Sequence, residues 1–160
     1  MINIDLDISI RSDKSLVWAF MSDVTKGLSM NRYHSRVITD THKVSMGMEF
    51  LIAHKIFLNQ DTMIAKVIEF SPPHEFTISE EPSDKTKIGF THNCSYRLKK
   101  SGYGTKLSCQ VTGTYGSMFL DLPFKPVLRV TIIEELLRIK LALESTQPKM
   151  DMQKHRLELV

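Results

Sequence analysis

Apolar and polar residues alternate along the first stretch of the chain, over residues 2–11. A period of two predicts a half-buried strand with one face in water. The apolar face of this strand carries Ile4, Leu6, Ile8 and Ile10.

Two short helices are expected next. Ser12 and Asp13 offer an N-cap to the first helix, and apolar residues follow them at helical spacing. The pattern of a second helix, at about residues 24–31, is interrupted by Gly27.

From residue 34 onward the pattern is typical of successive strands. Turn residues separate them at Asn59–Asp61, at Ser71–Pro73 and at Glu81–Asp84. The expected strands cover residues 34–44, 48–58 and 62–70, a short segment around Phe76 and Ile78, and the two arms of a hairpin at 88–99 and 107–115.

The hairpin has the clearest alternation, and its turn lies at residues 101–104. A turn centred on residues 102–103 brings Cys94 close to Cys109 on the inward face. Two reduced core thiols are expected there, and a cross-strand disulfide is the alternative.

The last expected element is a helix over residues 124–145, with Pro123 and Pro126 in its first turn. Two apolar stripes run along it, which suits a helix held in the concave side of a bent sheet. One stripe carries Leu128, Ile132, Leu136, Ile139 and Leu143, and the other Val130, Ile133, Leu137 and Leu141. The side expected to face water carries Thr131, Glu134, Glu135 and Arg138.

Composition fits one domain of ordinary globular type. The 160 residues are 42% hydrophobic and 24% charged, with a net charge of +3. The scattered basic residues argue against a nucleic-acid partner, and no apolar run could span a membrane, although transient membrane contact stays open. The absence of an export signal and the two cysteines predict a cytoplasmic protein.

The expected order of elements is a strand, two helices, six strands and a long helix. This order, together with five sequence motifs, resembles the START-like, helix-grip superfamily. The motifs are, in order, SDKSLVWAFMSDV, Gly47, KVIEFSPPHEF, GYGTKLSC and LRIKLALES. The bacterial branch that this chain resembles is the polyketide cyclase/dehydrase and lipid transport group, SRPBCC. The resemblance implies an α+β fold over residues 1–146, with a curved seven-stranded antiparallel sheet in the order 1-7-6-5-4-3-2, two short helices and one long C-terminal helix. Residues 147–160 would then be a flexible tail. It also implies a cavity between sheet and helix for a lipid, quinone, polyketide or aromatic compound. Many relatives carry a tryptophan after the second helix, where this chain has Tyr33 and His34.

Three inward positions could carry chemistry: His54, His92 and Tyr96. An imidazole titrates near neutrality and can act as a general base, but a core histidine with a satisfied hydrogen bond is equally compatible with the pattern. His54 and His92 would lie three strands apart, roughly 14 Å at ~4.8 Å per strand, so each is expected to act alone. The expected ligand-binding residues are Phe50, Ile52, His54, Ile88, Phe90, His92, Cys94, Tyr96, Val111, Tyr115, Val130 and Leu137.

Other chemistries find no motif. No HxxxH or CxxC spacing, phosphate loop or GxSxG elbow occurs, so neither a metal nor a cofactor is expected.

The first hypothesis is a module that binds a hydrophobic small molecule, as a monomer or homodimer. The alternatives are a cyclase or dehydratase with a lone histidine or tyrosine as general base, and a protein-interaction module. Residues 117–124 could cover the cavity mouth or simply pack at the sheet end.

Overall fold

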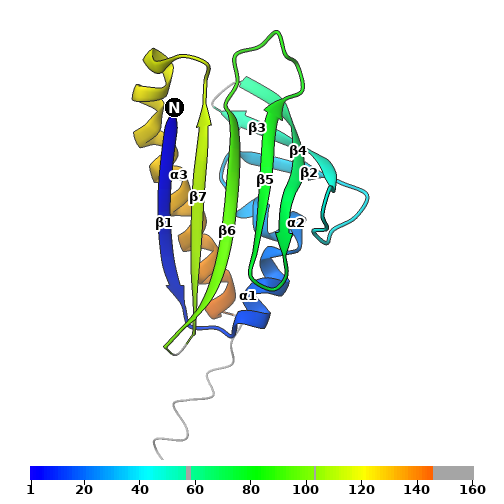
Figure 1. Cartoon of the computed structure of the whole chain (residues 1–160), viewed down its shortest axis with the longest axis vertical. Coiled ribbons are helices and arrows are strands. Elements are labelled where there is room, and N and C mark those ends of the chain that lie inside the picture. Colours follow the sequence, from blue (N-terminus) through cyan, green and yellow to red (C-terminus); the bar gives the residue numbers. More distant parts are fainter. Residues whose placement is uncertain (57–58, 103, 146–160) are drawn as a thin grey trace, which may run out of the picture.

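The computed structural model describes residues 1–56, 59–102 and 104–145. Seven antiparallel strands form one curved sheet in the order β1-β7-β6-β5-β4-β3-β2, as the resemblance implied, and a long helix lies along it (Figure 1). This is the expected α+β helix-grip architecture. The elements are β1 (Ile2–Ile10), α1 (Lys14–Met21), α2 (Val24–Gly27), the 3-10 turn η1 (Leu28–Met30), β2 (His34–Ile38), β3 (Glu49–Ile56), β4 (Asn59–Ser71), β5 (Glu75–Pro82), β6 (Thr91–Ser101), β7 (Gly104–Thr114) and α3 (Met118–Ser145).

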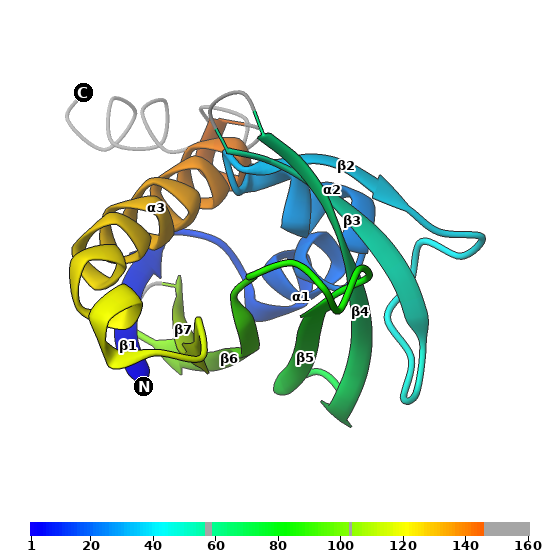
Figure 2. The ribbon, with the colours of Figure 1, turned by 90° about the horizontal axis from the view of Figure 1, so that it is seen from above.

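The sheet curls so that its two edges approach each other around a central space. Figure 2 shows α3 alongside β1 and β7 and running toward β2, which closes the open side of the curl. Ile68 is an extra residue in β4, where the register with β5 shifts between Val67 and Glu69. Such a bulge bends a strand and strengthens its twist, so it contributes to the curvature that leaves space inside.

Several strand boundaries differ from the prediction. Asn59, Gln60 and Asp61 do not form a turn but begin β4, paired with residues of β3. Near the same end of β4, β5 continues through Pro82 because Glu80, Glu81 and Pro82 stay paired with β4. The predicted strand at 34–44 shortens to β2.

The start of α3 also differs, since the helix begins at Met118 rather than at residue 124. The Ser117 hydroxyl accepts a bond from the Phe119 amide, and Asp121 accepts bonds from the Tyr115 amide and the Thr114 hydroxyl. The first of these contacts satisfies an amide in the first turn of the helix, and the other two join residues 114 and 115 to the helix. Pro123 and Pro126 therefore lie inside α3, on its exposed side, where water can bond the carbonyls that they leave unpaired.

One of the two predicted apolar stripes of α3 is buried and the other is exposed. Ile132, Leu136, Ile139 and Leu143 are at most 8% exposed, whereas Leu137 is 46% exposed. The expectation of a doubly buried helix is wrong because Thr131 and Glu135 take the second inward position, both under 5% exposed. The outward apolar residues are Val130, Ile133, Leu137 and Leu141. Within the described residues, no helix is both long enough and apolar enough to cross a membrane.

Candidate functional site: a buried histidine–glutamate cluster beneath an aromatic wall

A cavity of about 70 Å³ lies between the concave side of the sheet and α3. It shares His54, Phe90 and Tyr115 with a wider pocket of about 220 Å³ nearer the surface. We call these the inner cavity and the outer pocket. The inner cavity has apolar walls and a strongly polar floor, and it is lined by Asn31, Tyr33, His34, His54, Glu80, Phe90, His92, Cys94, Val111, Tyr115, Leu128, Thr131, Ile132 and Glu135.

The floor is formed by four side chains from four strands, His34, His54, Glu80 and His92, which we call the histidine–glutamate cluster. Glu80 is 2% exposed. Its Oε2 atom lies 3.4 Å from His54 Nε2, and its Oε1 atom lies 3.7 Å from His92 Nε2. The two histidines therefore approach opposite oxygens of one carboxylate.

Strand register explains how these side chains meet. His34 is the direct partner of His54 across β2 and β3, and their rings stack with centroids 4.8 Å apart. His92 is likewise the direct partner of Glu80 across β6 and β5. The partner of Glu80 on β4 is Ala65, whose methyl group leaves room for the longer carboxylate side chain to reach toward β3.

Burial and charge act in opposite directions on the cluster. Burial disfavours an ionised Glu80, but the surrounding histidines, His92 first, outweigh it and lower the pKa of Glu80 to about 2. Burial lowers the pKa of His34 to about 4, although Glu80 opposes that shift. At neutral pH the cluster thus contains a carboxylate and at least one neutral imidazole.

A second buried carboxyl group, that of Glu135 in α3, faces the same cavity. It accepts hydrogen bonds from the Tyr96 hydroxyl at 2.6 Å and from Asn31 Nδ2 at 2.8 Å. Burial raises the pKa of Glu135 to about 7, even though both hydrogen bonds act to lower it. The cavity therefore contains one carboxyl group that is ionised at neutral pH and one that is about half protonated.

Aromatic rings form a continuous wall above the cluster. Phe90 stacks on His92 with centroids 4.5 Å apart and on Tyr115 at 4.9 Å, and Tyr115 contacts Phe124 of α3 at 4.8 Å. Burial raises the pKa of Tyr115 to about 12, so its hydroxyl stays protonated. Met118, Phe119 and Leu122 are more than 70% exposed, whereas Phe124 contacts the ring of Tyr115 in this wall.

Half of the residues predicted to bind a ligand line the inner cavity: His54, Phe90, His92, Cys94, Val111 and Tyr115. Phe50, Ile52 and Tyr96 are buried in the core, and Ile88 is exposed and lines the outer pocket. Val130 and Leu137 lie on the exposed side of α3, so their assignment to the cavity is wrong.

The expectation that His54 and His92 are independent is also wrong. Strand spacing places their backbones far apart, but the sheet is curved and Glu80 reaches between them. Sequence reasoning missed His34, Glu80 and Glu135. Polar residues on the inward parity of a strand are the available signal, and Glu80 shares that parity with Phe76 and Ile78.

The two cysteines lie close to each other in the core, as predicted. Their sulfur atoms are 3.6 Å apart, and both thiols are free and buried. The hydrogen bond with Cys94 and burial raise the pKa of Cys109 well above its ordinary value, so neither feature favours a reactive thiolate.

Comparisons of structure identify the same fold in several known proteins. The di-domain ARO/CYC StfQ from the steffimycin biosynthetic pathway is 13% identical, with a TM-score of 0.70 over 90% of this chain and 51% of StfQ. Ara h 8.0201 is 8% identical, with a TM-score of 0.70 over 90% of this chain and 98% of its own. Protein CV1439 from Chromobacterium violaceum is 12% identical, with a TM-score of 0.68 over 89% and 96% of the two chains. No protein-family model matches the sequence, and no curated protein does.

Proposed function

We propose that this protein binds a small aromatic or polyketide-type molecule, with its ring in the inner cavity and its polar group directed toward the histidine–glutamate cluster. The observation that carries the proposal is the position of a wall of stacked rings directly above a buried, charged floor. Binding sites for small molecules combine apolar walls with a few polar groups in this way. The resemblance to the START-like superfamily, which implies a cavity between sheet and long helix, supports this proposal.

An engineered apolar cavity of about 150 Å³ holds benzene, and the inner cavity has about 70 Å³. An aromatic ring that enters the inner cavity would therefore extend into the adjoining outer pocket of about 220 Å³. Flat rings also gain from contact with Phe90 and Tyr115, because offset stacking adds about 0.5–1.5 kcal/mol per aromatic pair.

The experiment is native mass spectrometry of the purified protein, with organic extraction of anything that copurifies. We expect a 1:1 complex with 2-naphthol, a weaker complex with a quinone such as menadione, and no stable complex with palmitate. Stoichiometric recovery of a long-chain lipid would mean that the ligand is a lipid and not an aromatic compound. A protein that stays empty against all three would refute the binding proposal.

A second candidate is a cyclase or dehydratase, and the contrast between Glu80 and Glu135 favours it. Catalytic sites often hold two titratable groups whose pKa values are driven apart, and here the two values are about 2 and about 7. In a dehydration, His54 or His92 would take the proton from carbon, and protonated Glu135 would give a proton to the departing hydroxyl group. Tyr96 is a positioning residue in this scheme, because it is buried and donates its hydroxyl proton to Glu135.

The enzyme candidate is tested with a β-hydroxyketone substrate and the absorbance of the α,β-unsaturated ketone that loss of water produces. We expect His92→Ala to remove turnover while ligand affinity stays within a few-fold of wild type. His54→Ala and Glu135→Gln should also slow the reaction. Unchanged turnover in all three variants, or no turnover in the wild type, would exclude the enzyme and leave the binding proposal intact.

A further inference from the structure

Two buried polar atoms in the cluster face each other without a hydrogen bond. His54 Nε2 and Glu80 Oε2 are 3.4 Å apart, and neither has a hydrogen-bond partner among the described residues. A buried carboxylate oxygen without a partner costs more than an ordinary lost hydrogen bond. A group that bonds to both atoms would remove this cost.

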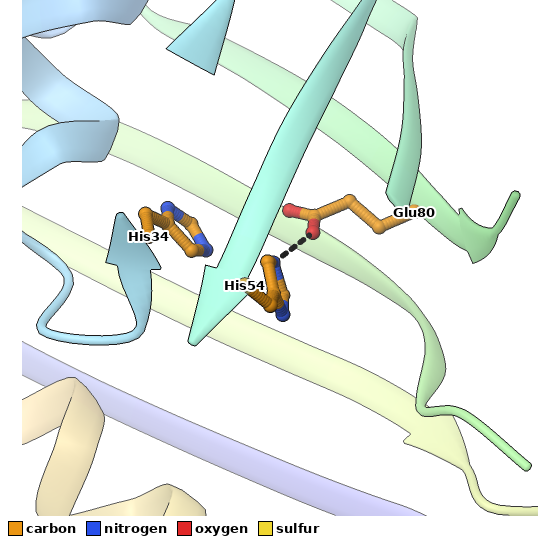
Figure 3. Close-up of side chains that lie close together, drawn as sticks. All are labelled: His34, His54 and Glu80. Carbon is orange, nitrogen blue, oxygen red and sulfur yellow. Dashed lines mark ion pairs between the residues drawn. The ribbon is translucent and has the colours of Figure 1, made fainter. Parts of the chain in front are cut away.

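His34 contributes a third donor to the same point. One potential ligand atom each from His34, His54 and Glu80 lies within 4.8 Å of the other two. Figure 3 shows these three side chains converging from three different strands. Because β2, β3 and β5 hold them, the donor set is built on the sheet rather than on a surface loop.

The outer hydrogen bonds orient the rings as metal-binding histidines are oriented. His34 Nδ1 donates to the Leu28 carbonyl at 2.8 Å, and His92 Nδ1 donates to the Phe90 carbonyl at 2.8 Å. Ligating histidines usually donate one ring N–H to a carbonyl or carboxylate, which presents the other nitrogen to the ion. Here Nε2 of His34 is left available, and Nε2 of His92 is directed at the second oxygen of Glu80.

We propose that His34, His54 and Glu80 bind one divalent first-row transition-metal ion of the Zn²⁺ type, with His92 positioning Glu80 through its other oxygen. This site goes beyond the proposed small-molecule binding and does not depend on it. Two ligand atoms on a tetrahedral ion, at bonds of about 2.0–2.1 Å, lie about 3.4 Å apart, which matches the separation of His54 Nε2 and Glu80 Oε2. All three ligand atoms lie within 4.8 Å of one another, so side-chain rotation would bring the remaining pairs to this separation.

Three protein ligands leave at least one coordination position open. His34, His54 and Glu80 all line the inner cavity, so that position faces the space where a small molecule would bind. An open position is characteristic of catalytic rather than structural ions. Two histidines and one carboxylate also form a known ligand set for Zn²⁺ and Fe²⁺.

The test is titration of chelator-treated full-length protein with Zn²⁺ by calorimetry and with Co²⁺ by visible absorption. We expect one ion per chain and Co²⁺ d–d bands of low coordination number. His54→Ala and Glu80→Gln should each lower the affinity at least 100-fold, and His92→Ala about tenfold, as for other groups that orient a ligand. The matched control is His74→Ala, which removes an exposed histidine outside the cavity and should bind as wild type does.

A second readout avoids any dependence on variants that fold poorly. In the wild-type protein labelled with ¹⁵N, Zn²⁺ should shift the imidazole resonances of His34 and His54 and leave that of His74 in place. Binding that survives both His54→Ala and Glu80→Gln, or Zn²⁺ shifts confined to other histidines, would mean an adventitious surface ion and overturn the proposal. Absence of any binding at one ion per chain would overturn it as well, without affecting the small-molecule proposal.

Discussion

The hydroxyl group of Tyr96 in β6 donates a 2.6 Å hydrogen bond to Oε1 of Glu135 in α3. Tyr96 is 1% exposed and Glu135 is 2% exposed. The bond joins the centre of the sheet to the long helix beside the inner cavity. It therefore links the stability of the fold to the protonation of a carboxyl group in the candidate site.

Removal of this donor should destabilise the fold. In Tyr96→Phe the buried Glu135 keeps its bond from Asn31 but loses the stronger partner, and an unsatisfied buried group costs about 1–3 kcal/mol. Urea unfolding at pH 8, where Glu135 is mostly ionised, measures the change. The control is the double variant with Glu135→Gln, since additive costs would show that the two residues do not interact.

The pH dependence of stability should change in Glu135→Gln. The pKa of Glu135 is raised from 4.5 to about 7 in the folded state, so the folded protein binds more protons than the unfolded chain between these values. Stability therefore falls as pH rises from about 4.5 to 7, by up to about 3 kcal/mol from this residue. His34 acts in the opposite direction, because its folded pKa is lowered to about 4.

The quantity to measure is the free energy of unfolding of Glu135→Gln minus that of wild type, across pH 4 to 8. Subtraction cancels the contribution of His34 to a first approximation. We expect this difference to rise with pH. The wild-type protein loses the stability that protonated Glu135 contributes at low pH, whereas the variant has no carboxyl group to titrate at this position. A difference that is flat across the range would contradict a raised pKa for Glu135.

Neighbouring leucines on α3 should respond very differently to truncation. Leu136 is 3% exposed and Leu137 is 46% exposed. Leu136→Ala leaves a cavity in the core and should cost about 2–5 kcal/mol, whereas Leu137→Ala should change stability by less than about 1 kcal/mol. Equal costs in thermal or urea unfolding would mean that both sides of the helix are packed, as the sequence pattern suggested.

The cysteines should be unreactive while the protein is folded. Both Cys94 and Cys109 are buried, so a thiol reagent cannot reach them in the folded protein. Thiolate formation at Cys109 is also disfavoured, and the thiolate is the form that reacts. We expect Ellman's reagent to label neither thiol in native buffer within minutes and both thiols in guanidinium chloride. Rapid labelling of the native protein would contradict the burial of the thiols. Fewer than two labels per chain after unfolding without a reducing agent would contradict their being free.

Much of the fold was predictable because the inward residues of most strands are apolar. The pairing of β6 with β7 follows directly from alternation and a short turn, and it places Cys94 near Cys109 as expected. Prediction failed where polar residues are buried with partners far along the chain. Glu135 looks like a surface residue on a helical wheel, and its burial depends on Tyr96 and Asn31, which lie 39 and 104 positions away.

The site was only partly predictable for the same reason. Histidines on inward strand positions could be identified, and His54 and His92 do line the cavity. Their convergence on Glu80 requires the curvature of the sheet and the exact register of β5, neither of which a local pattern contains. The spacing of metal ligands along the sequence is equally uninformative here, because the donors come from β2, β3 and β5.

The most direct test of small-molecule binding is the affinity of 2-naphthol, by calorimetry, for wild type, Leu128→Trp and Leu137→Trp. Both substitutions introduce the same indole on α3, but Leu128 lines the inner cavity and Leu137 is exposed. With all three proteins folded by circular dichroism, we predict that Leu137→Trp binds as wild type does and that Leu128→Trp binds at least tenfold more weakly. Equal affinity of Leu128→Trp and wild type would contradict a ligand site between the sheet and the helix.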